Sequence, residues 1–123
     1  MKGYIWAGVL ALGVLGSTSS AVAQGRSFYL MQYNSTVTEM NRVVDRINSL
    51  KTDIKTEKDF TRGCSMLGSL ISDMKEAQIL TERLADYAYQ LDDMDGHRQA
   101  VDRHNAYLEE RHYWEEQRDR MCK

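Results

Sequence analysis

Apolar residues in the first half of the chain recur in alternating steps of four and three, the spacing of one face of an α-helix. The stripe skips only Lys51, and Val43 and Leu50 widen it. Its members are Tyr33, Val37, Met40, Val44, Ile47 and Ile54. Proline, the strongest helix breaker, is absent from the chain. We therefore predict a long amphipathic helix over about 27–54 with coiled-coil-like packing.

A second helix is predicted over about 57–94. Thr56 to Asp59 has the form of a capping box, in which a hydroxyl accepts a backbone N–H and an acid lies in the first turn. The apolar stripe that follows drifts in phase between Gln78 and Thr81, which suits either one long curved helix or two helices. We favour one helix. The stripe consists of Phe60, Cys64, Leu67, Ile71, Met74, Leu80, Leu84, Tyr87, Leu91 and Met94.

The strongest turn signal lies between residues 92 and 96, where three aspartates precede Gly96. We expect Gly96 to take the left-handed conformation that ends a helix, and a third helix to follow over about 97–121. Its apolar stripe is thin and consists of Ala100, Val101, His104, Tyr107, Leu108, Trp114 and Met121. The predicted fold class is all-α, an antiparallel three-helix bundle or a long helical hairpin with a docked third helix.

The N-terminus has the three parts of a secretory leader. Lys2 is basic, residues 4–16 are apolar apart from glycines and one tyrosine, and Ala-Val-Ala at 21–23 has the small-x-small pattern of a cleavage site. A retained anchor would need about 20 apolar residues. We expect a signal peptide over 1–23, cleavage between Ala23 and Gln24, and one mature domain over 24–123. This domain would be periplasmic or secreted, without stable membrane insertion.

The charge balance limits the possible partners. The chain has 16 basic and 18 acidic residues, and Lys2 is the only charged residue before Gln24, so the mature protein has a net charge near −3. This balance argues against nucleic acid or an anionic membrane as the main partner. About a hundred residues form one domain, near the lower size limit of a self-sufficient core.

The two cysteines of the chain fall in the mature part, and an even count in an oxidising compartment favours a disulfide. Counted from the turn at 95–96, Cys64 lies about 31 residues back and Cys122 about 26 residues forward. In an antiparallel pair this difference corresponds to roughly 7 Å at 1.5 Å per residue. That offset is close to the longest Cα separation that a disulfide allows. We predict a Cys64–Cys122 disulfide.

Helix 97–121 contains candidate metal ligands. Glu109 and His112 have the Glu-x-x-His spacing of di-iron bundles, but the second copy and the further inward glutamates are missing. His104 lies about 12 Å along the helix from His112, too far for one metal to bridge. A haem could be held by Met31 or Met40 together with His104 or His112. A metal- or haem-binding periplasmic bundle is therefore kept as an alternative, and we expect no cofactor.

No catalytic motif such as Gly-x-Ser-x-Gly, His-Glu-x-x-His or a glycine-rich phosphate loop occurs, so we expect no enzyme. Several apolar and aromatic residues lie off the main stripes: Phe28, Tyr29, Leu30, Tyr89 and Tyr113. In outline the chain is similar to small periplasmic helical proteins that act as chaperones, stress sensors or adaptors. The leading hypothesis is an exported interaction protein that binds another polypeptide or its own copy. A second alternative is a membrane-anchored coiled-coil envelope or phage protein.

Overall fold

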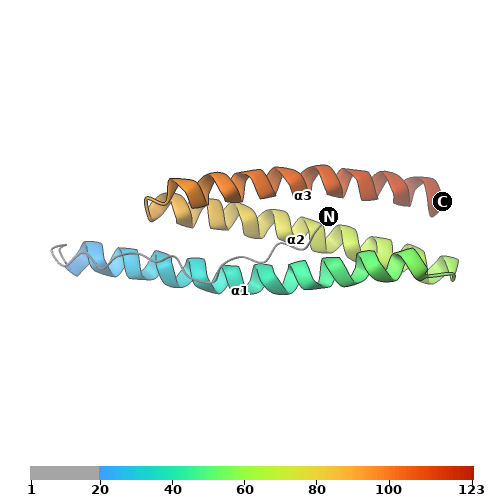
Figure 1. Ribbon diagram of the computed structural model, residues 1–123, viewed down its shortest axis with the longest axis horizontal. Helices are drawn as coiled ribbons and strands as arrows, with labels where there is room; N and C mark the ends of the chain where they lie inside the picture. The colour runs from blue at the N-terminus through green and yellow to red at the C-terminus, as the bar shows by residue number, and fades with distance from the viewer. Residues whose placement is uncertain (1–19) are drawn as a thin grey trace.

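The computed structural model describes residues 20–123, which form three helices (Figure 1). They are α1 (Ser20–Thr56), α2 (Phe60–Gln90) and α3 (Met94–Met121). Consecutive helices run antiparallel, so α1 and α3 point the same way along the molecule (Figure 1). The predicted all-α three-helix bundle is confirmed. The basic and apolar parts of the predicted leader lie outside the described residues, and cleavage after Ala23 stays a prediction.

α2 is the central helix of the bundle. α1 and α3 each pack on α2, whereas the backbones of α1 and α3, as far as the chain is described, do not pack on each other. Figure 1 shows α2 passing between the other two helices. The facing sides of α1 and α3 therefore form the walls of a cleft instead of a third packed interface.

The predicted apolar stripe of α1 forms the core of the α1–α2 interface. Its buried members are Tyr33, Val37, Met40, Val43, Val44 and Ile47. α2 contributes Leu70, Met74, Ala77, Leu80, Leu84, Ala85, Ala88 and Leu91 to the same cluster. Full burial of a large apolar side chain stabilises the fold by about 1.5–3 kcal/mol. Apolar packing is therefore the main force that holds α1 on α2.

α2 is one continuous helix, as we favoured from the sequence, but it begins later than predicted. α1 continues through Thr56, whose hydroxyl donates to the carbonyl of Asp53. Thr56 therefore does not cap α2, and the predicted capping box is wrong. The N-cap is Asp59, whose carboxylate accepts the backbone N–H of Arg62 at 2.8 Å. An aspartate supplies both an acceptor and a negative charge at a helix N-terminus, which favours a start at Phe60.

Aspartates, and not Gly96, build the turn between α2 and α3. Asp92 has a left-handed φ of 57°, and the N–H groups of Asp92 and Asp93 donate to the carbonyls of Tyr89 and Ala88 at 3.1 and 2.9 Å. This Schellman pairing ends α2. Asp93 caps α3, because its carboxylate accepts the N–H of Gly96 at 3.0 Å. The prediction of a left-handed Gly96 is wrong: Gly96 lies in the first turn of α3, where a side chain would crowd the Asp93 carboxylate.

α3 has few buried residues. Only Ala100 and Tyr107 are fully buried, and Trp114 packs against the core while partly exposed. Val101 and Met121, which the sequence placed on the apolar stripe, are exposed. α3 therefore contributes fewer buried apolar side chains to the bundle than α1 does.

Candidate functional site

A buried ion pair links α1 to α3 across the side of α2. The Lys51 ammonium contacts the Glu110 carboxylate, and the two side chains are only 11% and 19% exposed. Lys51 occupies the stripe position between Ile47 and Ile54, so the helical period turns its stem towards the core. A buried charge without its partner is costly. The pair is therefore favourable only when α1 and α3 lie in this register.

Charges from the turn and from α3 also act on α1 nearer the start of the bundle. Tyr33 of α1 is buried, and this burial raises the pKa of its phenol. The Asp93 carboxylate raises that pKa further, and the Arg103 guanidinium lowers it. α1 and α3 therefore influence each other through polar and charged groups along their facing sides, although their backbones do not pack.

An open cleft of about 390 Å³ surrounds the Lys51–Glu110 pair. Its α1 wall consists of Asn48, Lys51, Thr52 and Lys55, and its α3 wall of Glu110, Tyr113 and Trp114. The lining residues therefore carry two ammonium groups, one carboxylate, one amide, two hydroxyls and two aromatic side chains. These charged and polar groups could bind a polar or charged ligand.

Two polar groups in this lining have no partner among residues 20–123. Lys55 forms no ion pair or hydrogen bond, in contrast to Lys51. The indole N–H of Trp114 is shielded from solvent and has no acceptor. Because this nitrogen is shielded from solvent, a ligand in the open cleft reaches Lys55 but not the indole N–H.

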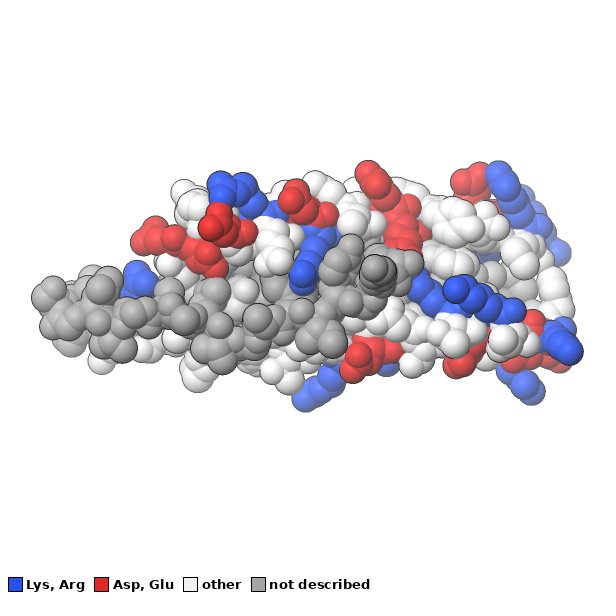
Figure 2. All heavy atoms as spheres, viewed as in Figure 1, with Lys and Arg blue, Asp and Glu red and all other residues white. Residues whose placement is uncertain are grey.

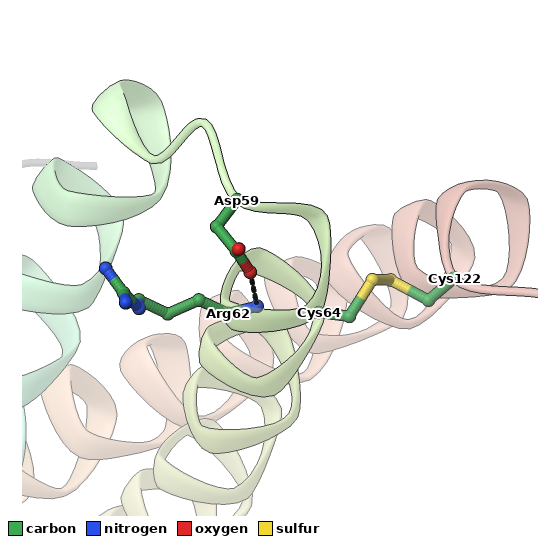
Figure 3. Close-up of a disulfide and its surroundings, with 4 residues drawn as sticks. All are labelled: Asp59, Arg62, Cys64 and Cys122. Carbon is green, nitrogen blue, oxygen red and sulfur yellow. Dashed lines mark hydrogen bonds between the residues drawn. A yellow bond between two sulfur atoms is a disulfide. The ribbon is translucent and has the colours of Figure 1, made fainter.

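Cys64 and Cys122 form a disulfide between the start of α2 and the end of α3 (Figure 3). Their Cα atoms lie 5.9 Å apart and are separated by 58 residues in sequence. The cysteines predicted to pair are therefore joined. Figure 3 also places the Asp59 cap in the same part of α2. The crosslink closes the α2–α3 hairpin at the end opposite its turn.

The residues proposed as metal ligands do not come together. Nδ1 of His104 lies 3.0 Å from the carbonyl oxygen of Gln78, at the α2–α3 interface. Glu109 and His112 are exposed, and His112 lies 3.7 Å from Glu115. In the described part of the chain, no group of three or more His, Cys, Asp or Glu side chains could hold a metal ion.

The possible haem ligands lie in different surroundings. Met40 is buried in the α1–α2 core, whereas Met31 is exposed on α1. His97 is half-buried, with Nδ1 2.8 Å from the carbonyl oxygen of Ala85. His97 and His104 thus each contact a carbonyl of α2, and both have a structural role in holding α3.

Four of the exposed large apolar side chains lie at the turn end of the bundle. Phe28 and Met31 lie on the outer side of α1, and Tyr89 and Met94 flank the α2–α3 turn. An ion pair of 4.0 Å between Arg26 and Asp92 places this part of α1 beside the turn. Of the off-stripe residues noted in the sequence, Phe28, Tyr89 and Tyr113 are exposed, whereas Tyr29 and Leu30 pack against the core.

Acidic and basic side chains are mixed over the face shown in Figure 2. On the exterior of the bundle, Arg46 of α1 contacts Asp73 of α2 at 3.3 Å and Glu76 of α2 at 2.9 Å. None of the helices within residues 20–123 has the length and apolar content needed to cross a bilayer. Because acidic and basic side chains are mixed, this face has no large area of one charge sign that would favour a polyanion or a polycation.

Sequence reasoning missed the cleft, although one signal was present. Lys51 is the only polar position in the apolar stripe of α1, and such a residue needs a buried partner. The partner could not be chosen from the sequence, because Glu109, Glu110, Glu115 and Glu116 all lie on the same stretch of α3.

Comparison of the chain with models of protein families, with curated proteins and with solved structures found no match. The candidate sites therefore rest on the geometry alone.

Proposed function

We propose that this protein is an exported, non-enzymatic interaction protein that binds another polypeptide through the apolar residues at its turn end. The supporting observation is the exposure of Phe28, Met31, Tyr89 and Met94, which are 51%, 61%, 56% and 41% exposed. Large apolar side chains that gather on a surface mark sites of protein association. Aromatic residues and methionine are also the types enriched in protein interfaces.

The form of α1 supports this proposal. Phe28 and Met31 are three residues apart, so they lie next to each other on the solvent side of the helix. Neighbouring Tyr29 packs towards α2, with its ring 6.4 Å from that of Tyr87. The inner contacts fix the helix, and its outer apolar pair is then presented on a rigid support, which lowers the entropic cost of binding.

The predicted leader and the two cysteines support the proposal that the protein is exported to an oxidising compartment. A secretory leader would deliver the chain to an oxidising compartment, where a disulfide between Cys64 and Cys122 persists. The mixed charges on the surface suit recognition by apolar contact rather than by long-range attraction. The partner is therefore another exported polypeptide, and self-association is the competing outcome that the experiment below separates.

The test combines light scattering with capture of partners from the native compartment. We expect a Phe28→Ser/Met31→Ser double variant to lose capture of the partner while the melting temperature stays unchanged. Phe60→Ser is the control, since Phe60 is 65% exposed but lies at the other end of the bundle. A protein that is strictly monomeric and captures nothing specific, or a double variant that binds like the wild type, would refute the proposal.

A further inference from the structure

The cleft between α1 and α3 lies towards the disulfide end of the bundle, away from the apolar residues of the turn. It exists because both helices pack on α2 and their facing sides stay apart. Its volume of about 390 Å³ lies within the range of small-molecule sites, about 300–1,000 Å³. The Lys51–Glu110 pair forms one part of the lining and holds the two walls in register.

The charges in the cleft leave one positive charge in excess. Lys51 and Lys55 face a single acid, Glu110, which is engaged by Lys51. Lys55 has no acidic partner among residues 20–123. The protein as a whole has a net charge of −2, so this local excess runs against the overall balance. A ligand with one negative charge at this point would neutralise Lys55.

The remaining lining residues supply hydrogen-bond donors. The Asn48 amide lines the same side of α1 as Lys55. On the other wall, the ring of Tyr113 is half exposed, whereas the Trp114 N–H is shielded from solvent and does not open into the cleft. Several donors and one aromatic surface suit a planar acceptor attached to a carbon chain.

From this geometry we propose that the cleft is a binding site for a carboxylate group. The carboxylate pairs with Lys55 and accepts hydrogen bonds from the donors of the lining, while the carbon chain rests on Tyr113. A carboxylate fits better than a phosphate dianion, because the nearby Glu110 would repel a second negative charge. The carboxylate can belong to a small organic acid or to an acidic side chain, and the cleft would bind both by the same contacts.

Trp114 provides a direct readout. It is the only tryptophan in the chain besides Trp6, which lies in the predicted leader. In the processed protein, or in the full chain with Trp6→Phe, the indole fluorescence and the indole N–H resonance report on this cleft alone. The probes are glutarate, the uncharged glutaramide, inorganic phosphate and an acetylated, amidated Glu-Tyr dipeptide, all at constant ionic strength.

We expect glutarate or the dipeptide to shift the Trp114 resonance and to saturate, while glutaramide leaves it unchanged. Lys55→Gln should weaken this binding about tenfold or more, since it removes a charge-assisted hydrogen bond. Lys55→Arg should retain it. Lys58→Gln is the matched control, because it removes the same charge from an exposed loop position outside the cleft.

The outcomes decide between the sources of the carboxylate. Tighter binding of glutarate assigns the site to small organic acids, and tighter binding of the dipeptide assigns it to acidic side chains. The proposal fails if neither probe saturates, if phosphate binds as tightly as the carboxylates, or if Lys55→Gln and Lys58→Gln weaken binding equally. These outcomes are independent of Phe28 and Met31, so they leave the proposed function untouched.

Discussion

The two interfaces of α2 are held by different forces. Towards α1, an apolar stripe with steps of four and three meets the apolar side chains of α2, and the contact is apolar over most of its length. Towards α3, the contact rests on two small or aromatic residues, two histidines that reach backbone carbonyls, and one disulfide. The Lys51–Glu110 ion pair also links α3 to α1.

This difference shows how a helix with little apolar surface can belong to a compact bundle. Apolar burial stabilises an interface in proportion to its area, and α3 offers little such area. A covalent link and a few directional contacts hold it in one register instead. We therefore expect α1–α2 to respond to changes of side-chain volume and α3 to respond to changes of redox state and charge.

The largest effect should come from the disulfide. A Cys64→Ser/Cys122→Ser variant should lose about 4 kcal/mol of unfolding free energy, the chain-entropy value for a loop of this length. Urea denaturation under non-reducing conditions measures this loss. Wild-type protein with the disulfide reduced should match the variant. A loss below about 1 kcal/mol would show that the other α2–α3 contacts suffice to dock α3.

The apolar interface should show the next largest effect. Ile47→Ala empties a fully buried position in the α1–α2 core and should lower the unfolding free energy by about 3 kcal/mol. Val101→Ala removes an exposed residue of α3 and should change it by less than about 0.5 kcal/mol. Equal losses in the two variants would contradict the difference in burial between Ile47 and Val101.

Loss of the Lys51–Glu110 ion pair should lower the unfolding free energy by less than the loss of a core side chain. Lys51→Met leaves the Glu110 carboxylate largely buried without its partner and should cost about 2 kcal/mol. The double variant Lys51→Met/Glu110→Leu should recover most of this loss, because an apolar pair can replace a buried ion pair. If the double variant is less stable than the single one, the pair contributes more than the cost of its burial.

A substitution in the α2–α3 turn should have the smallest effect on stability, and it should stabilise the protein. Asp92 has a left-handed φ, which glycine adopts without strain, so Asp92→Gly should stabilise the protein by about 0.5 kcal/mol. Asp95→Gly, in the first turn of α3, should destabilise it by a similar amount. Thermal denaturation measures the melting temperatures of both variants. Shifts of the same sign in the two variants would contradict this explanation of the turn.

The elements that follow from local rules could be predicted from the sequence. The apolar stripe of α1 predicted which face of the helix is buried, because steps of four and three residues place all its members on one side of an α-helix. The disulfide partners followed from the length of the hairpin arms and the rise per residue. The sequence left one or two helices open for the region of phase drift, and the single helix that we favoured is the one observed.

The elements that depend on competition between neighbours could not be predicted. Thr56 and Asp59 are both good caps, and α1 extends through the first, so the second caps α2. Gly96 and Asp92 can both adopt positive φ, and the Asp93 cap places the turn at Asp92. The cleft depends on the angle between α1 and α3 around α2, which no helix period specifies. Lys51 is a polar residue in an apolar stripe and so indicated a buried partner, but only the structure identifies that partner as Glu110.

Hydrogen exchange, measured helix by helix in the oxidised and reduced protein, tests most directly whether α3 is held chiefly by the disulfide. We expect reduction to expose the amides of α3 to rapid exchange, while the amides of α1 and α2 around Met40 and Leu84 stay protected. Unchanged protection of α3 after reduction would contradict this conclusion. Loss of protection in all three helices together would contradict the independence of the α1–α2 interface.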